Sequence, residues 1–249
     1  MIPRDIYVTW KSKDLSGSPV WMQRYLAGWQ SMNPGYTFHL CDDADCEALF
    51  HEVRDEVQAE LGIDVLDLYH RLEKQVEKTD LWRYLVIYTK GGLYTDADTA
   101  CLVPCEKWIL PTDRAITGFE RFKCEHPTQY CQWTFAAEPK HPFLGLVLQR
   151  VSESIQSVKG NDRMATLSRT GPIVYTNALI EFIESNGDRF KDVMDKDRVV
   201  SHGLHLLPKI AFSGGLVYHR FAGTWKHWWH RPGWFWRLRN AGRDTPKEG

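Results

Sequence analysis

Along the first hundred residues of the chain, hydrophobic positions follow two patterns in turn, one typical of strands and one typical of helices. Strands are predicted where β-branched and aromatic residues alternate with polar ones, at residues 5–10 and 36–41. Helices are predicted where bulky apolar residues recur every three or four positions, at residues 19–32 and from about 42 to 74, with a break near Gly62. Because the strands alternate with helices, we expect a mostly parallel α/β sheet in this part of the chain.

Residues 77–104, EKTDLWRYLVIYTKGGLYTDADTACLVP, carry charged residues inside a strongly apolar pattern. The first part has apolar side chains on most faces of a helix, which predicts a helix that is buried on most sides. The two glycines Gly91 and Gly92 end it, because Gly91 can adopt the left-handed conformation common at helix C-termini. The apolar pattern then resumes and predicts a strand that contains both Asp96 and Asp98.

The rest of the chain has weaker periodicity. After irregular strands, helices are predicted at about 142–158 and after a loop near 168–171, and late strand and loop elements at 203–212 and 215–225. The chain has no internal repeat and no low-complexity tract. We therefore expect one domain over residues 1–230 and a separate tail at 231–249.

Four charged residues in the 77–104 segment are candidates for a site. Asp80 and Arg83 are three residues apart on a helix and share one face. Asp96 and Asp98 are two residues apart near a strand end, so both carboxylates should point to one side. Paired carboxylates suit a hard divalent cation, which substrate phosphates would share. The alternatives are that Asp96 and Asp98 are an Asp-x-Asp sequence that binds no metal, and that Asp80 and Arg83 form an ion pair on the helix surface, which contributes little to stability.

Composition narrows the class of protein. Hydrophobic residues make up 43% and charged residues 25% of the 249, as in soluble globular proteins. The net charge of −1 gives no reason to expect a nucleic-acid partner. The eleven Trp residues suit either flat ligands such as sugars and bases or a Trp-rich core.

The cysteines and the N-terminus bear on the compartment. Six Cys are present without a Cys-x-x-Cys pair, which argues against structural zinc. Their even number would allow disulfides in an oxidising compartment, but free buried thiols are the favoured prediction. The N-terminus starts directly with a predicted strand, and no apolar run approaches the ~20 residues of a membrane span. We expect a cytoplasmic or soluble chain without signal peptide or anchor.

The segment KTDLWRYLVIYTKGGLYTDADTACLVP resembles the donor-sugar-binding region with the DXD motif of glycosyltransferase family 32. This family includes fungal Golgi α-mannosyltransferases, inositol-phosphoceramide mannosyltransferases and bacterial capsule enzymes, and clostridial glucosylating toxins carry a related block. The positions that match the family pattern are Thr79, Asp80, Arg83, Tyr84, Gly91, Gly92, Tyr94, Asp96 and Asp98.

Three further segments are similar to the family in the same order. IPRDIYVTWK matches its opening block at Thr9 and Trp10, RTGPIVYTNAL resembles its T-G-P block, and YHRFAGTWKHW resembles its late H-H-x-x-G-S-W block. One departure is Arg220, which stands where the family usually has a second His after His219. The resemblance covers most of residues 2–229.

The resemblance implies a GT-A fold, with a Rossmann-like nucleotide-binding sheet flanked by helices and an acceptor-facing C-terminal part. It implies a retaining transfer of a hexose from a nucleotide-sugar donor to a glycan, glycoprotein or glycolipid acceptor. Mannose from GDP-mannose is the favoured donor and a UDP-hexose the alternative. The implied cofactor is Mn²⁺ or Mg²⁺, since both prefer oxygen ligands.

The resemblance also assigns roles to residues. The implied sites are catalytic Asp80, Arg83 and Asp98; donor-sugar-binding Asp80, Arg83, Gly91, Gly92 and Tyr94; nucleotide-binding Thr9, Trp10, Asp96 and Trp225; an acceptor or substrate loop at Thr170, Gly171 and Pro172; and metal ligands Asp96, Asp98 and His219. The alternatives are purely structural roles: Trp10 as a core residue, His219 as a structural histidine and residues 170–172 as a turn.

Other functions compete with this one. A haloacid-dehalogenase-like phosphohydrolase would use Asp96 as nucleophile and Asp98 as acid, but position 100 is Ala where that pattern has Thr or Val. A glycoside hydrolase needs carboxylates on opposite sides of the scissile bond, which neighbouring positions on one strand face do not provide. A non-catalytic carbohydrate-binding module is the third alternative.

The C-terminal tail mixes basic and aromatic residues. Arg231, Arg237 and Arg239 lie among Trp234, Phe235 and Trp236. Such a segment suits either peripheral membrane contact or packing back onto the domain, and Pro232 and Gly233 interrupt any continuous amphipathic helix.

Overall fold

The structure is a computed structural model of the 249-residue chain and describes residues 1–120 and 129–222. Cys124, Trp225 and the 231–249 tail, with its predicted membrane contact, lie outside these residues. In the described part, no helix is long and apolar enough to cross a membrane. The five cysteines described there are free, and four of them are buried, which agrees with the favoured prediction of thiols.

The helices and strands follow the hydrophobic periods of the sequence closely. The strands are β1 (Asp5–Thr9), β2 (Thr37–Cys41), β3 (Gly92–Thr95), β4 (Thr99–Cys101), β5 (Ala115–Phe119), β6 (Tyr130–Ala137), β7 (Arg198–Val200), β8 (Leu204–Leu207) and β9 (Val217–His219). The helices are α1 (Val20–Met32), α2 (Asp43–Leu61), α3 (Val65–Arg71), α4 (Gln75–Lys90), α5 (Pro142–Ser157), α6 (Arg163–Arg169), α7 (Pro172–Ser185) and α8 (Phe190–Val193), besides short turns such as η3 (Ala211–Gly215).

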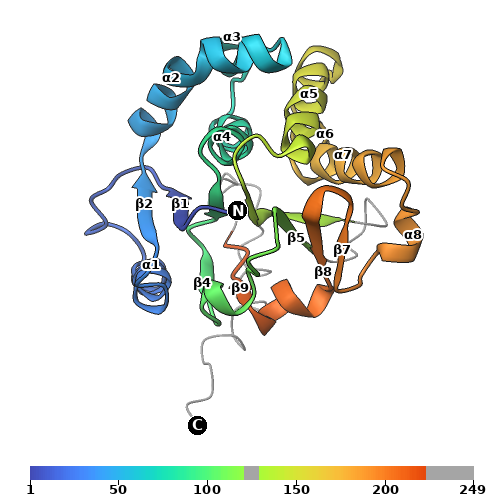
Figure 1. Ribbon diagram of the computed structural model, residues 1–249. Coiled ribbons are helices and arrows are strands. Elements are labelled where there is room, and N and C mark those ends of the chain that lie inside the picture. The colour runs from blue at the N-terminus through green and yellow to red at the C-terminus, as the bar shows by residue number, and fades with distance from the viewer. Residues whose placement is uncertain (121–128, 223–249) are drawn as a thin grey trace.

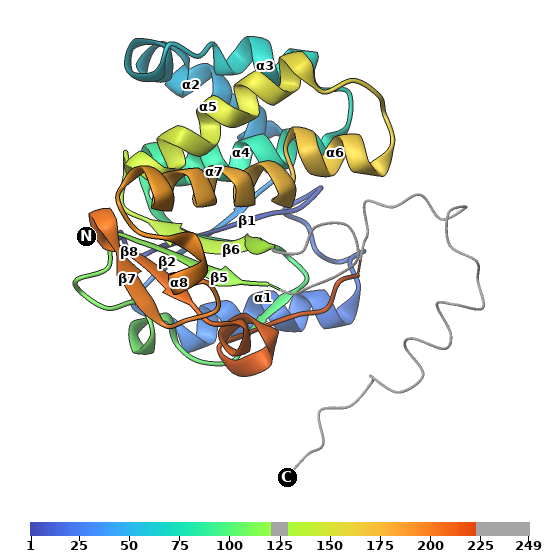
Figure 2. The same ribbon diagram turned by 90° about the vertical axis from the view of Figure 1, so that its right-hand side faces the viewer.

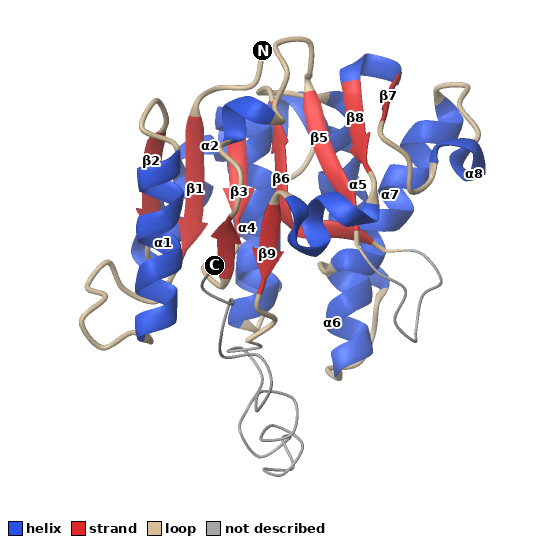
Figure 3. Cartoon of the chain, turned by 90° about the horizontal axis from the view of Figure 1, so that it is seen from below, coloured by secondary structure: helices blue, strands red, loops and turns tan. Residues whose placement is uncertain are grey.

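The main sheet has seven strands in the order β2-β1-β3-β6-β5-β8-β7, which Figure 3 shows from below. The strands of the first hundred residues pair in parallel, β1 with both β2 and β3, as predicted. The rest of the sheet, for which no pairing was predicted, is mixed: β6 pairs antiparallel with both β3 and β5, and β8 pairs parallel with β5 and antiparallel with β7. Residues 105–141 lack the alternation of strand and helix that forces parallel pairing.

Two core layers cover the two faces of this sheet. Helices α2 to α7 pack on one face, and α1 lies on the other together with the small sheet of β4 and β9 (Figures 1 and 2). Helix α4 lies against the first face and is buried over nearly its whole central part, as its apolar pattern predicts. The site residues on α4 are therefore enclosed between this helix layer and the sheet.

Capping residues set the boundaries of the helices near the site. Asp42 accepts from the Asp45 N–H and Asp45 accepts from the Asp42 N–H, a capping box that begins α2. Gly62 ends α2 in the left-handed conformation. Gly91 ends α4 with a positive φ of 73° but an extended ψ of −170°, so it redirects the chain straight into β3.

Candidate functional site

Asp96 and Asp98 lie in a turn and not within a strand. The sequence predicted one continuous strand here, but β3 ends at Thr95 and β4 begins at Thr99 in a different sheet. The turn closes because the Thr99 N–H and hydroxyl both donate to the Asp96 carbonyl, at 3.1 and 2.6 Å. The two carboxylates therefore converge because of a turn between two sheets. They do not converge because alternate residues of a strand point to the same side, as the sequence predicted.

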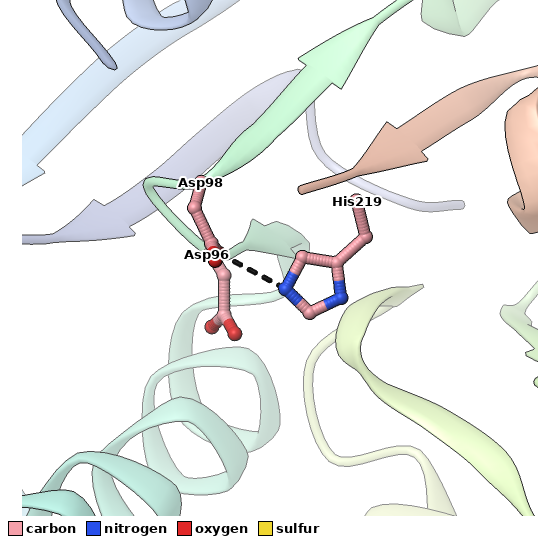
Figure 4. A group of neighbouring side chains, drawn as sticks. All are labelled: Asp96, Asp98 and His219. Carbon is pink, nitrogen blue, oxygen red and sulfur yellow. Dashed lines mark hydrogen bonds and ion pairs between the residues drawn. The ribbon is translucent and has the colours of Figure 1, made fainter. Parts of the chain in front are cut away.

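Asp96, Asp98 and His219 form a cluster at this turn (Figure 4). Their ligand atoms all lie within 4.8 Å of one another. His219, at the end of β9, contacts the Asp98 carboxylate through Nε2 at 3.0 Å. The Ala222 N–H donates to the other Asp98 oxygen at 2.8 Å, and the Arg220 N–H donates to the Asp98 carbonyl at 2.9 Å. Asp98 thus joins the DXD turn to the segment that follows β9.

Burial and neighbouring charges perturb all three groups. Burial, together with the charge of Asp98, raises the pKa of Asp96 despite the Arg83 guanidinium. Burial would also raise the pKa of Asp98, but the hydrogen bond and charge of His219 outweigh it and hold that pKa below its usual value. Burial would lower the pKa of His219, and the neighbouring carboxylates raise it instead. The site therefore concentrates negative charge that a cation would neutralise.

Asp80 and Arg83 form a buried pair beside this cluster. Asp80 is 2% and Arg83 is 5% exposed, which excludes the helix-surface alternative. Arg83 contacts Asp80 at 3.1 Å and Asp96 at 3.4 Å, and its guanidinium lies 4.7 Å from the centre of the Tyr94 ring. Tyr94 in turn donates its hydroxyl proton to Asp96 at 2.6 Å. Arg83 therefore links the helix carboxylate to the first Asp of the DXD turn.

Gln132 and Thr170 complete the surroundings of Asp80. The Gln132 amide donates to one Asp80 oxygen at 3.3 Å, and the Thr170 hydroxyl donates to the other at 2.9 Å. The Gln132 carbonyl accepts from Arg83 at 3.2 Å, and Tyr84 contacts both the Thr170 carbonyl and the Gln132 side chain. Burial raises the pKa of Asp80 to about 7, although Arg83 and Thr170 favour its carboxylate.

The sequence patterns did not indicate Gln132 as a site residue. It lies in β6, where every residue is buried. The available signal was a Gln inside an otherwise apolar and aromatic strand, since a buried amide needs hydrogen-bond partners.

The remaining predicted site residues lie at the end of β1 and at the start of α7. Thr9 ends β1, which pairs with β3, and Thr170 contacts Asp80, so Thr170 belongs to the network. Trp10 follows β1, is half-buried against the core layer that contains α1, and donates from its Nε1 to Ser18 at 2.9 Å, so its nucleotide contact stays a prediction. Gly171 is the N-cap of α7 and Pro172 its first residue, and both are buried.

Gly91 and Gly92 lie at the other end of β3 from Asp96. A Cβ on Gly91 would stand 2.6 Å from Pro139 and 2.8 Å from Pro3, and one on Gly92 would stand 2.7 Å from the Asp5 carbonyl. The two glycines thus allow α4 and β3 to approach β1, and this packing accounts for them without a sugar. The geometry gives no support to the prediction that they bind the donor.

The donor set fits a divalent cation. Two carboxylates and an imidazole converge, and His219 turns its Nε2 toward the Asp98 carboxylate (Figure 4). Hard divalent cations prefer oxygen ligands and accept imidazole in mixed sites. A cation here would face the buried Arg83 and Asp80, which offer a rigid fork of donors and an acceptor to a polar ligand such as a sugar hydroxyl.

One stretch of the chain matches the model of a known protein family. Residues 19–115 match the family described as "Glycosyltransferase sugar-binding region containing DXD motif". That range includes Asp80, Arg83, Asp96 and Asp98, but not Gln132, Thr170 or His219. A divalent metal is the typical ligand of the DXD motif in this family.

Two curated fungal proteins are similar over most of the chain. The initiation-specific alpha-1,6-mannosyltransferase of Schizosaccharomyces pombe is 28% identical over 90% of this chain and 64% of its own length. The protein of the same name from Candida albicans is 26% identical over 74% of this chain and 54% of its own length. The chain thus spans little more than half the length of these relatives.

The structure titled "PaToxG Glycosyltransferase" aligns with a TM-score of 0.55 at 19% identity, covering 75% of this chain and 72% of that one. Such a likeness bears on the fold alone. The fold is of the GT-A type, as the resemblance in the sequence implied.

Proposed function

Since residues 19–115 are a glycosyltransferase sugar-binding region with a DXD motif, we propose that this chain is the catalytic domain of a retaining glycosyltransferase. The proposed domain spans residues 1–230. The proposed reaction moves a hexose from a nucleoside diphosphate sugar to a glycan or glycolipid acceptor. GDP-mannose is the favoured donor, because both fungal relatives are named as mannosyltransferases, and a UDP-hexose is the alternative.

The observation that carries the proposal is the junction of two groups of residues in one buried network, in which Arg83 contacts both Asp80 and Asp96. Asp96, Asp98 and His219 would hold Mn²⁺ or Mg²⁺, which when bound supplies positive charge for the diphosphate leaving group. Asp80 and Arg83 would orient the donor sugar through its hydroxyls, since their side chains are already fixed by Gln132 and Thr170.

The same geometry weighs against the phosphohydrolase alternative. Asp96 would be the nucleophile of that reaction, yet its Oδ1 accepts a hydrogen bond from Tyr94 and contacts Arg83. Both interactions stabilise the carboxylate and reduce its nucleophilicity. A sugar-binding module without catalysis would not need the acidic cluster beside the sugar-binding pair.

The test is nucleotide-dependent protection and turnover. GDP, UDP and their hexose conjugates are added with Mn²⁺, and the melting temperature and the release of nucleotide are measured. At a ligand concentration of about 100 times Kd, binding should stabilise the fold by about 2.7 kcal/mol. Asp98→Asn should lose the effect, and Asp67→Asn on the exposed face of α3 should keep it. If no nucleotide protects the wild type with any cation, the proposal fails, and the anomer formed, seen by NMR, tests retention.

A further inference from the structure

Phe221 has a backbone conformation that is rare for a bulky residue. Its φ is 53°, in the left-handed region that favours glycine. Its side chain is also 59% exposed. Strained residues of this kind persist where the surrounding structure imposes them, and they concentrate at functional sites.

The DXD turn imposes this conformation. The residues on both sides of Phe221 donate their N–H groups to Asp98, Arg220 to its carbonyl and Ala222 to its side chain. The chain must turn at Phe221 to make both bonds. The turn places the Phe221 ring 3.9 Å from the His219 ring, centre to centre, and 6.3 Å from the Trp133 ring. An exposed aromatic ring is thus fixed directly beside the acidic cluster.

The ring lies on the β6 side of the acidic cluster, because it contacts both His219 and Trp133. Trp133 comes from β6, which lies on the far side of β3 from β1 (Figure 3). The predicted nucleotide-binding residues Thr9 and Trp10 are at the end of β1. Asp80 and Arg83 come from α4, on the opposite face of the sheet from β9 (Figure 1). A donor whose nucleotide lies at the β1 end would leave the exposed Phe221 ring available to a second substrate.

Polar groups suited to a sugar accompany the ring. Glu120 follows β5 and is only partly buried, and it pairs with Gln129 directly before β6, the strand that carries Trp133. The Gln129 amide donates to Glu120 at 2.7 Å, and the Glu120 N–H donates to the Gln129 carbonyl at 2.7 Å. These bonds fix the carboxylate and leave it acceptor capacity. An aromatic face next to a fixed carboxylate matches a pyranose, which has one apolar face and a rim of hydroxyl donors.

We propose that Phe221 and Glu120 form an acceptor subsite that binds a pyranose ring, which stacks on Phe221 and donates a hydroxyl hydrogen bond to Glu120. This inference rests on the proposed function, since it assigns the second substrate of that reaction. It requires a neutral sugar ring at this position, whatever larger glycan or lipid carries it.

The test uses methyl α-mannoside, methyl α-glucoside and methyl α-galactoside as probes of the full chain with GDP and Mg²⁺, with binding measured by NMR titration. At least one probe should bind the wild type. Phe221→Gly should weaken that binding about tenfold, and its melting temperature should not fall, because glycine relieves the positive φ. Phe221→Trp should keep the affinity within about twofold. Glu120→Gln should also weaken binding, since a charge-assisted bond is lost. Val199→Ala, at an exposed position on β7, is the control and should bind like the wild type.

Two results would overturn the subsite: equal probe binding by Phe221→Gly and wild type, or nucleotide binding by the wild type without binding of any probe. The proposed function fails separately, when GDP and UDP give no cation-dependent protection. If a probe still binds through Phe221 in that case, Phe221 belongs to a sugar-binding site, but that site does not bind the acceptor of a glycosyl transfer.

Discussion

At the scale of single residues, the site depends on the buried guanidinium of Arg83, which lies between the buried Asp80 and the half-buried Asp96. Arg83 contacts Asp80 and Asp96, and Gln132 supplies its backbone carbonyl as a third acceptor. A buried charge is costly when it stands alone and tolerable when it is paired and hydrogen-bonded. The arrangement of these residues therefore serves both folding and the proposed binding of the donor.

Arg83→Met should destabilise the protein by about 3–5 kcal/mol, because it leaves the buried Asp80 carboxylate and the half-buried Asp96 carboxylate without their paired guanidinium. Urea unfolding at pH 7 measures the difference. The matched control is Arg71→Met, which breaks the exposed Arg71–Asp67 pair on α3 and should cost less than about 1 kcal/mol. Similar losses in the two variants would contradict the structural role of Arg83.

Gln132→Met should test the residue that holds Asp80 in place. It removes the amide that donates to Asp80 but keeps the β6 carbonyl that accepts from Arg83. We expect kcat/KM for the nucleotide sugar to fall about 10- to 100-fold, since small displacements of positioned groups are costly. Protection by GDP and Mn²⁺ should persist, because the acidic cluster is intact. Loss of both readouts together would mean that Gln132 has only a structural role.

At the scale of elements, the junction between α4 and β3 sets the position of the whole site. Asp80 and Arg83 belong to α4, while Tyr94 and Asp96 belong to β3 and the turn after it. Gly91 and Gly92 join these elements with positive φ angles, packed against prolines and the β1 backbone. Helix α5, which covers α4, begins at a histidine cap.

Gly91→Ala should destabilise the protein by more than about 2 kcal/mol, because the new Cβ meets Pro139 and Pro3 and the φ of 73° disfavours any side chain. Gly28→Ala is the control. Gly28 lies inside α1, where an added Cβ would have no atom within 4 Å, so this variant should gain about 0.5–1 kcal/mol. Thermal unfolding of the two variants should move in opposite directions.

His141 should make the protein sensitive to mild acid. Its Nδ1 accepts from the Phe143 N–H at the start of α5, and its Nε2 contacts the His202 carbonyl. Burial lowers its pKa to about 4. A lowered pKa means that its stabilisation is complete above the unfolded value of about 6.5 and is lost as the pH falls towards 4, a change of about 3 kcal/mol.

His141→Asn keeps a capping side chain and should flatten the decline of the unfolding free energy between pH 6.5 and about 4. His51→Gln, at an exposed position on α2, should keep the wild-type decline. An unchanged pH profile in His141→Asn would show that other groups cause the acid sensitivity.

At the scale of the whole molecule, the two core layers meet at the site. The layer of α2 to α7 holds Asp80 and Arg83 on α4, and the layer of α1, β4 and β9 holds His219. The DXD turn lies between them, since β3 belongs to the main sheet and β4 to the small one. Trp29 of α1 ties the second layer to this turn, because its indole N–H donates to the Thr99 carbonyl at 3.1 Å.

Trp29→Ala should therefore lower the stability of the whole domain and not of the α1 layer alone. We expect a loss of about 3–5 kcal/mol, with far-UV circular dichroism and tryptophan fluorescence shifting to the same new urea midpoint. Val20→Ala, exposed at the start of the same helix, should change neither. Separate transitions for the two probes would show that the layers unfold independently.

The sequence alone determined the elements and half of the site. Hydrophobic period and capping residues are local, so they predicted α1, α2, α4, β1 and β2, and the spacing of Asp80, Arg83, Asp96 and Asp98 indicated a ligand site. The resemblance to a known family extended this to the GT-A fold and to His219. The elements and the four charged positions needed only residues that are near one another in the chain, whereas the resemblance used the order of four segments along it.

Only the tertiary structure decided which distant residues join them. Antiparallel β6 brings Gln132 to Asp80 across 52 residues, and β9 brings His219 to Asp98 across 121. It also moved Asp96 and Asp98 from a strand into a turn and set Gly91 and Gly92 apart from the acidic cluster. Such pairings depend on burial and on the hydrogen-bond needs of groups far apart in sequence, and no local pattern carries that information.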